Sequence, residues 1–209
     1  EMKKVTLIVV AIVIAAGLAG CGSAPESPAG ESLAATLTPT PESTLSPQER
    51  YPTSGVISQW VLSAEASSEF ADPEWSAAQA VGSPDSPGCG DYQLAWASAP
   101  SDSIETLELT FEVGVFPLEI TIYESFNPDQ VVKVEVYNPE TGGYYTVLQK
   151  NPTPIERPCP YQLTVPVEGI EFRTDRVRVT VDQSQLGLGW NEIDAVELVG
   201  AISLPESGD

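Results

Sequence analysis

The amino-acid sequence predicts an all-β fold, an antiparallel sandwich or barrel, for residues 54–203. Apolar residues recur at every second position in several short segments, which is the pattern of half-buried strands. Clusters of Asn, Pro and Gly, which favour turns, separate these segments. A single segment, residues 73–81, has apolar residues at helical spacing. A stretch of about 150 residues can bury a proper core, so one domain is expected here.

The strands of this domain can be predicted in order. The alternation is clear in residues 130–138, where Val132, Val134 and Val136 are expected to face the core. Short strands separated in this way are typical of sandwiches and barrels. The same pattern predicts strands at residues 105–113, 117–124 and 176–182, and shorter strands at residues 55–61, 144–149, 161–167 and 194–200.

The composition excludes several functions. The 209 residues carry 30 Asp and Glu against 9 Lys and Arg, which gives a net charge of -21. Nucleic-acid binding depends on Lys and Arg, so no nucleic-acid partner is expected. The chain has no histidine, which rules out a Ser-His-Asp triad and a Cys-His pair. Its three cysteines form no CxxC motif, so a zinc site is not expected. We therefore expect a protein that is not an enzyme.

The first twenty residues have the pattern of an export signal. Two lysines precede an apolar run, residues 5–18, which is shorter than the ~20 residues that a membrane-spanning helix needs. The run ends in Leu-Ala-Gly-Cys at residues 18–21, which resembles the lipobox of bacterial lipoproteins. That resemblance implies a signal peptide at residues 1–20 and acyl chains, such as palmitate, on Cys21. An uncleaved N-terminal anchor is the alternative.

Residues 21–53 are predicted to form a disordered tether. They are rich in Pro, Ser, Thr, Ala and Glu, and they carry too little apolar surface to offset the entropy of ordering. At the other end of the chain, residues 204–209 are expected to be a short tail. Two or more acyl chains on Cys21 would hold the protein stably to a membrane. The expected location is therefore extracytoplasmic, with a lipid anchor in the cell membrane or at the cell surface.

Cys89 and Cys159 are the two cysteines that remain after lipidation, and both lie in loops rich in Pro and Gly. Export places them in an oxidising compartment, where disulfides persist. We therefore expect a disulfide between them. The alternative is a pair of free, buried thiols. A reactive catalytic cysteine is not expected, because no base is available to activate it.

Five segments of the sequence carry a resemblance to a known family: SSEFADPEWSAAQAVGSPD at residues 67–85, CGDYQLAWAS at 89–98, LELTF at 107–111, ITIYESFNP at 120–128 and GWNEIDAVELVG at 189–200. Together they resemble the galactose-binding-like β-sandwiches, which include the discoidin or coagulation-factor type C domains and several carbohydrate-binding modules. The last segment is the most telling, because it resembles the final strand of that fold. The resemblance implies an eight-stranded, two-sheet jelly roll with a ligand surface on the loops at one end.

The same resemblance implies a structural calcium ion, which many members of this group bind. Asp85 lies where members place an early acidic ligand, in the stretch that begins at Ala80, and Glu197 matches their late glutamate. Leu94 lies where others have Thr, so it would offer only its carbonyl, and Asp91 would add a second carboxylate to the loop. Calcium prefers such a mixture of carboxylates and carbonyls. The alternative is that these carboxylates cap turns or face water.

Sugar sites combine flat apolar faces with a few hydrogen-bonding groups. Trp75, Trp96 and Trp190 are expected to pack in the core or its loops instead of touching a ligand. Better candidates lie on predicted loops and strand ends, although aromatic residues there often only cover the core. These candidates are Tyr92, Tyr123, Phe126, Asn127, Tyr144, Arg157 and Tyr161.

The expected function is recognition of a glycan or a protein ligand by a membrane-anchored module, through loops at one end of the sandwich. A structural or assembly role in the cell envelope, without a small ligand, is the alternative. A glycoside-active enzyme is a third reading, because two carboxylates about 5–9.5 Å apart can hydrolyse glycosidic bonds. No local signature in the sequence supports that chemistry.

Overall fold

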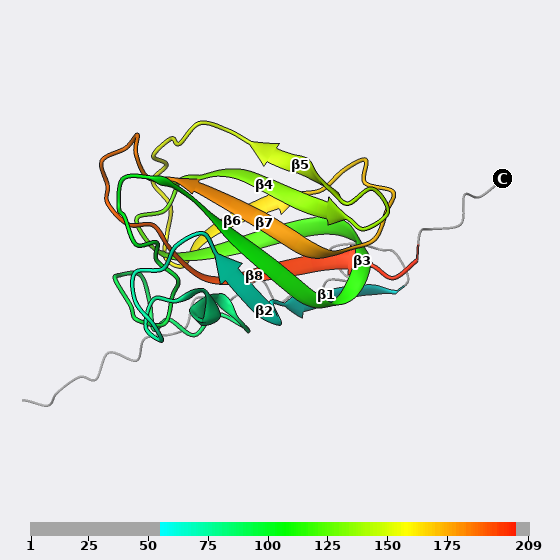
Figure 1. Ribbon diagram of the computed structural model, residues 1–209, viewed down its shortest axis with the longest axis horizontal. Helices are drawn as coiled ribbons and strands as arrows, with labels where there is room; N and C mark the ends of the chain where they lie inside the picture. Colours follow the sequence, from blue (N-terminus) through cyan, green and yellow to red (C-terminus); the bar gives the residue numbers. More distant parts are fainter. Residues whose placement is uncertain (1–54, 204–209) are drawn as a thin grey trace, which may run out of the picture. The chain divides into compact units, whose positions relative to one another are not determined.

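Two facing antiparallel sheets make up the domain that the structure, a computed structural model, describes; the described residues are 55–203 (Figure 1). One sheet has the order β1-β8-β3-β6 and the other β2-β3-β7-β4-β5, so β3 belongs to both. The predicted all-β antiparallel sandwich is confirmed. The elements are β1 (Val56–Trp60), β2 (Ser63–Ala66), the 3-10 helix η1 (Ala77–Ala80), β3 (Ile104–Phe126), β4 (Val131–Asn138), β5 (Gly143–Gln149), β6 (Tyr161–Pro166), β7 (Thr174–Asp182) and β8 (Glu192–Ala201).

Several expectations concern residues outside the described range. They are the signal peptide at residues 1–20, the lipidated Cys21 with the tether at residues 21–53, and the tail at residues 204–209. All of these stay predictions. Among residues 55–203, no helix is both long enough and apolar enough to span a membrane.

Strand β3 corrects the prediction of two separate strands at residues 105–113 and 117–124. It runs without interruption for 23 residues, and the pairing with β7 shifts in register between Thr110 and Val115. A shift of this kind bends a strand and lets it pass from one sheet to the other. Figure 1 shows β3 curling around the edge of the sandwich at this bend. Periodicity alone predicted two strands because the alternation of apolar residues is lost at the bend, although the strand itself continues through it.

Two shorter elements also differ from the prediction. The helical candidate at residues 73–81 forms only the single 3-10 turn η1, because Trp75 has a positive φ of 54° that no right-handed helix contains. Strand β2 was not predicted, since its four residues are too few for an alternation to stand out. In β4 the register shifts between Val131 and Lys133, so Val131 is buried and Val132 is only partly buried.

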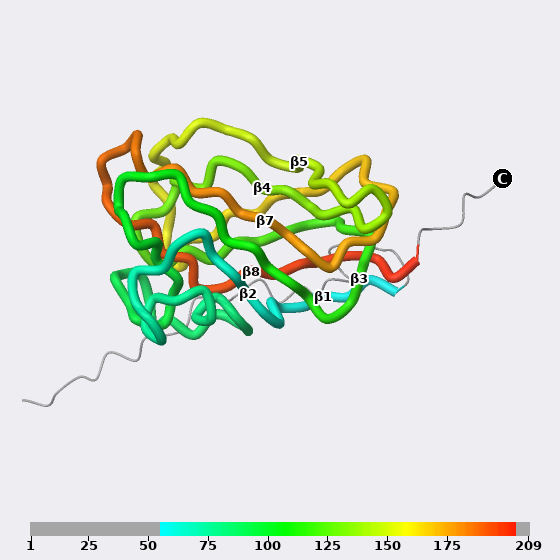
Figure 2. The backbone as a smooth tube through the Cα atoms, viewed as in Figure 1, coloured from blue at the N-terminus to red at the C-terminus, as the bar shows by residue number. Residues whose placement is uncertain are grey.

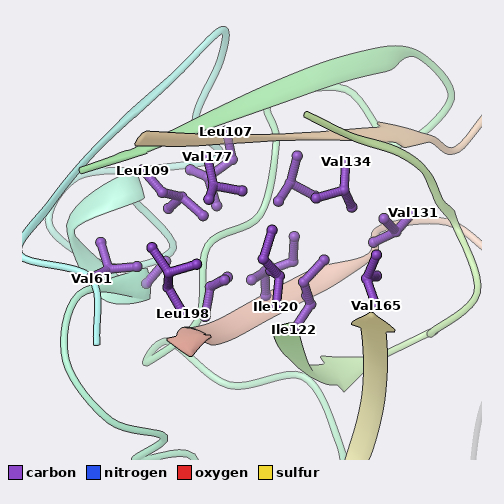
Figure 3. Packing of buried hydrophobic residues seen from close by; sticks show 14 of the residues in the cluster. Val61, Leu107, Leu109, Ile120, Ile122, Val131, Val134, Val165, Val177 and Leu198 are labelled. Atoms are coloured by element: carbon purple, nitrogen blue, oxygen red, sulfur yellow. The ribbon is translucent and has the colours of Figure 1, made fainter. Parts of the chain in front are cut away.

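The core lies between the two sheets, and Figure 3 shows their apolar side chains meeting there. The alternation predicted this arrangement, because every second residue of a strand points to the same side. One sheet contributes Leu107, Leu109, Val134, Val136, Val177 and Val179, and the other contributes Ile120, Ile122, Val165, Val196 and Leu198. Trp96 is also fully buried, as expected for this tryptophan.

Gly200 lies where β8 passes close to the bend of β3. A Cβ atom added to it would lie 2.4 Å from Val115 Cγ2 and 2.7 Å from the Phe116 carbonyl oxygen. We expect Gly200→Ala to lower the free energy of unfolding by about 2 kcal/mol, because backbone atoms in a packed interior cannot move aside. Urea unfolding measures this loss. Gly114→Ala is the matched control, since its new Cβ would meet only Arg173 Cβ at 3.9 Å; equal losses in both variants would contradict the expectation.

Strand β8 connects the two ends of the sandwich. Just beyond its last residue, the Ile202 amide donates a hydrogen bond of 3.0 Å to the Gly55 carbonyl oxygen, so the two ends of the described range lie together. At its first residue, Glu192 pairs with Phe126 of β3. Several loops gather there, as the tube in Figure 2 shows. We call this region the loop end; it comprises residues 67–103, 127–130, 150–160 and 183–191.

Candidate functional site

A small pocket opens between the loops of the loop end. Its cavity volume is about 120 Å³. Three aromatic side chains and two carboxylates line it, and we call it the aromatic pocket. The lining residues are Phe70, Trp75, Asp91, Ala97, Trp190 and Glu192.

The three aromatic rings of the pocket stand edge to face around Phe70. The ring centroids of Phe70 and Trp75 are 5.3 Å apart, with an interplanar angle of 74°. Those of Phe70 and Trp190 are also 5.3 Å apart, at 80°. Edge-to-face packing is the arrangement that aromatic pairs favour. Phe70 is nonetheless 48% exposed, which is unusual for so large an apolar side chain, so the rings line an open surface.

Hydrogen bonds fix the two tryptophans of the pocket. The Trp75 Nε1–H donates to Asp91 Oδ1 at 3.2 Å, and the Trp190 Nε1–H donates to the Ser98 carbonyl oxygen at 2.9 Å. The backbone of Trp75 adopts the left-handed region, with φ at 54°, and the Ala97 amide donates to its carbonyl oxygen at 3.1 Å. That region is costly for a bulky side chain, and such strain is concentrated at functional sites.

Glu192 supplies the buried carboxylate of the pocket. Its Oε2 accepts hydrogen bonds from the Tyr92 amide at 3.0 Å and from Ser125 Oγ at 3.1 Å. Burial raises the pKa of Glu192 to about 7, and the negative charge of Asp91 acts in the same direction. Asp91 itself is exposed. Two carboxylates therefore face the same small space, one at its wall and one at its rim.

Polar groups hold the segment that carries Trp190 and Glu192 in place. Asn191, between them, is buried, and its side-chain NH₂ donates to Glu124 Oε1 at 2.7 Å. The Asn127 side chain donates to the Leu188 carbonyl at 2.7 Å and to the Trp190 carbonyl at 3.1 Å. These contacts fix the loop against β3, so the pocket wall is built on a rigid strand end.

The predicted disulfide is confirmed. Cys89 and Cys159 are joined, at a sequence separation of 70. The bond attaches the loop that carries Asp91 to the segment just before β6. Because Asp91 lies two residues beyond Cys89, the disulfide also restrains the rim of the aromatic pocket.

The ligand candidates from the sequence occupy other places at or near the loop end. The Tyr92 ring lies beside Gly90, and the Tyr92 amide donates a hydrogen bond to Glu192 of the pocket. The Asn127 side chain donates a hydrogen bond to the Trp190 carbonyl oxygen and so holds the loop that carries Trp190. Phe126, at the end of β3, is the register partner of Glu192 and is partly buried. None of these three side chains lines the aromatic pocket.

The remaining ligand candidates make contacts with other parts of the protein. The Tyr123 ring packs against Trp60 with centroids 5.5 Å apart. Arg157 pairs with the buried Asp129, and it donates to the Gln162 carbonyl at 2.9 Å. Tyr161 opens β6 opposite Glu124. Their roles in ligand binding stay predictions.

The five predicted calcium ligands are spread over the domain. The Asp85 amide donates to Asp194 Oδ1 at 3.4 Å, whereas Glu197 lies in mid-strand, where it accepts hydrogen bonds from Ser58 and Tyr123. Ala80 is buried in η1, and Leu94 is 40% exposed. Within residues 55–203, no three Asp, Glu, Cys or His side chains are grouped so that they could hold a metal ion. A structural calcium stays a prediction.

A second hollow lies on the outer face of the larger sheet, over β2, β3, β5 and β7. Its cavity volume is about 400 Å³. Inside it, Glu108 pairs with Arg178 and accepts a hydrogen bond of 2.6 Å from the Tyr144 hydroxyl. The Arg178 guanidinium stacks 3.7 Å from the Tyr144 ring centroid. Tyr144, Glu108 and Arg178 therefore satisfy one another's hydrogen-bonding and charge requirements. The hollow is lined by Ser63, Ala64, Glu65, Glu108, Leu109, Thr110, Tyr144, Arg176 and Arg178.

Sequence reasoning assigned Trp75 and Trp190 to packing, and it did not single out Phe70 or Glu192. The sequence does contain a signal that could have indicated these aromatic residues. Phe70, Trp75 and Trp190 stand in long segments without apolar alternation, where a large ring has no strand face to cover. Only Asp91, predicted as a calcium ligand, is both a predicted site residue and part of the aromatic pocket.

The chain is similar to several known proteins. A family model described as Pappalysin-1, SD scarf domain, C-terminal, matches residues 50–207. No curated protein matches the chain. Among solved structures, a mutant form of chitosan-binding module 1 from a chitosanase/glucanase of Paenibacillus sp. IK-5 is 13% identical, with a TM-score of 0.51. That match covers 67% of this chain and 96% of the module.

Two further solved structures are similar. The family 32 CBM from C. perfringens NanJ, in complex with galactose, is 15% identical over 68% of this chain and 99% of that chain, with a TM-score of 0.47. A fucolectin from Morone saxatilis (striped bass) serum is 16% identical over 66% of this chain and 46% of that chain, with a TM-score of 0.48. The fold is a β-sandwich of the galactose-binding-like type, as the sequence segments predicted.

Proposed function

This chain belongs to the family described as Pappalysin-1, SD scarf domain, C-terminal, and from that premise we propose that it is a non-catalytic binding module for a glycan, with the aromatic pocket as its site. The observation that carries this proposal is the pocket itself. It combines three aromatic rings with two carboxylates at the loop end. Rings stack on the apolar faces of sugars, and carboxylates accept hydrogen bonds from sugar hydroxyls.

Names of similar proteins support the proposal without deciding it. The solved relatives include a chitosan-binding module and a CBM in complex with galactose. Sites differ among proteins that share a fold, so the ligand of this chain follows from its own residues. We also propose that the module is displayed outside the cytoplasm by the lipid on Cys21 and the tether at residues 21–53.

The decisive variant is Trp75→Ala. Trp75 contributes a ring of the pocket and is only partly buried, so its removal opens the site without opening the core. We expect about tenfold weaker binding to any glycan that the intact domain binds, because a stacking ring contributes about 1 kcal/mol beyond the area that it buries. Titration calorimetry against a panel of polysaccharides and oligosaccharides, each in calcium and in EDTA, measures the affinity.

Trp60→Ala is the matched control. Trp60 is a partly buried tryptophan on β1 that packs against Tyr123, outside the aromatic pocket. It is expected to leave affinity unchanged. Equal loss in the two variants would place the ligand elsewhere, and an absence of glycan binding by the intact domain would reject the proposed function. A release of reducing ends from any polysaccharide in the panel would reject its non-catalytic character.

A further inference from the structure

The charges of the aromatic pocket have one sign. Its lining contains Asp91 and Glu192 and no Lys or Arg. Lys and Arg are frequent partners of buried carboxylates in proteins, and this domain does pair Arg157 with Asp129 and Arg178 with Glu108. The two pocket carboxylates have no such partner among the lining residues. A ligand that enters the pocket therefore meets the carboxylate of Asp91 and, in Glu192, a second acidic group whose pKa burial raises to about 7, and no Lys or Arg of the lining offsets either.

The aromatic rings add to the same electrostatic preference. The face of an aromatic ring is electron-rich, and among the aromatic side chains tryptophan attracts cations most strongly. Two tryptophans and one phenylalanine stand around the space that Asp91 and Glu192 face. Aromatic cages recognise ammonium ligands in proteins, and a carboxylate adds a charge-assisted hydrogen bond to an ammonium group.

The indole N–H groups of the pocket are not available to bind a ligand oxygen in this arrangement. Trp75 uses its N–H on Asp91, and Trp190 uses its N–H on the Ser98 carbonyl. A neutral sugar brings hydroxyls that both donate and accept, and here its acceptors would lose water without a replacement from either indole. An ammonium group only donates, so its needs match carboxylates and ring faces.

On the basis of the proposed function, we infer that the aromatic pocket selects a glycan that carries a protonated primary amine, that is, an amino sugar without an N-acetyl group. The ammonium would lie between Asp91 and Glu192, with the sugar ring against Trp75 or Trp190. Its positive charge would favour the ionised form of Glu192 beside Asp91. The cavity of about 120 Å³ admits part of one sugar residue, which leaves the rest of a chain outside.

The test compares ligands that differ only at the amine. Tetrasaccharides of β-1,4-linked glucosamine and of N-acetylglucosamine are titrated into the domain at pH 6 by calorimetry. We expect at least about tenfold tighter binding of the free amine, the scale of a desolvated cation–π contact together with a charge-assisted hydrogen bond. Equal affinities, or tighter binding of the acetylated chain, would overturn the inference.

Two variants locate the selectivity. Asp91→Asn keeps an acceptor for Trp75 Nε1–H, and Glu192→Gln keeps one for the Tyr92 amide. Each therefore removes an ionisable acidic group that could pair with the ammonium while preserving a hydrogen bond. Each is expected to reduce the preference for the free amine about tenfold while affecting the acetylated chain little. Glu112→Gln, at an exposed position of β3, is the charge-matched control and should keep the full preference. Because Asp91 is exposed, its variant is informative even if Glu192→Gln fails to fold.

The failures of the two proposals are distinguishable. A neutral sugar that binds at least as tightly as the free amine, and whose binding is lost in Trp75→Ala, would uphold the glycan module and overturn the amine selectivity. Selectivity that persists in both Asp91→Asn and Glu192→Gln would place the amine outside this pocket. Because Asp91 is also a predicted calcium ligand, the titration is repeated with calcium and with EDTA; an absolute need for calcium would overturn the direct ammonium contact.

Discussion

Replacement of both bridged cysteines, Cys89→Ser with Cys159→Ser, is expected to lower the free energy of unfolding by about 4 kcal/mol. The bond closes a loop across 70 positions of the chain, so it restricts the unfolded ensemble strongly. In the folded state it joins two segments, residues 67–103 and 150–160, in which little regular structure is present. Ligand affinity should fall as well, because the rim residue Asp91 follows Cys89 closely.

Urea unfolding in the presence and absence of a reductant measures this effect. The intact domain should lose stability on reduction, and the double variant should show the low stability in both conditions. This comparison separates the effect of the bond from the effect of the serine side chains. An unchanged unfolding midpoint in the double variant would mean that the two loops hold their positions without the bond.

Stability is also expected to fall as the pH rises from about 4.5 to about 7, with Glu124 as a main cause. Burial raises the pKa of Glu124 to about 7. The Asn191 hydrogen bond and the charge of Arg157 oppose that shift, and so does Lys150, while Asp129 adds to it. Its Oε2 accepts no hydrogen bond from residues 55–203. Between the unfolded and the folded pKa, the folded state binds more protons, so the free energy of unfolding decreases with pH.

The variant Glu124→Gln removes this titration while preserving an acceptor for Asn191. We expect it to raise the free energy of unfolding at pH 8 by on the order of 3 kcal/mol, and to have little effect at pH 4. Thermal and urea unfolding at both pH values test this. Glu112→Gln removes one charge from an exposed position and so corrects for the general repulsion in an acidic protein. A similar pH dependence in the two variants would assign the effect to net charge instead of Glu124.

The fold was largely predictable from the sequence because its core obeys a simple periodicity. Val177 and Val179 in β7 alternate with charged residues, and both are buried as expected. The prediction failed where the backbone departs from regular pairing. The bend in β3 between Thr110 and Val115 and the shift in β4 beside Val131 depend on contacts with other strands, which a local pattern does not contain.

The aromatic pocket was less predictable for a different reason. Phe70 and Trp190 are far apart in the chain, and their ring contact arises only because β8 begins where the long loop after β2 returns. The distinction between a tryptophan that fills a core and one that lines a surface depends on these tertiary contacts. Trp96 and Trp75 stand in the same loop, and only the first is fully buried. Their sequence surroundings did not distinguish the tryptophan that fills the core from the one that lines the pocket.

The contact between Ile202 and Gly55 has a consequence for how the pocket meets other molecules. The chain enters and leaves the sandwich at the same pole, and the aromatic pocket begins at the opposite end of β8. Ten residues of extended strand separate the two poles by about 30 Å. A lipid, a bead or another domain attached next to Gly55 or Ile202 would therefore lie at the end of the sandwich opposite the aromatic pocket. In this respect the sandwich is a spacer between the point of attachment and the pocket.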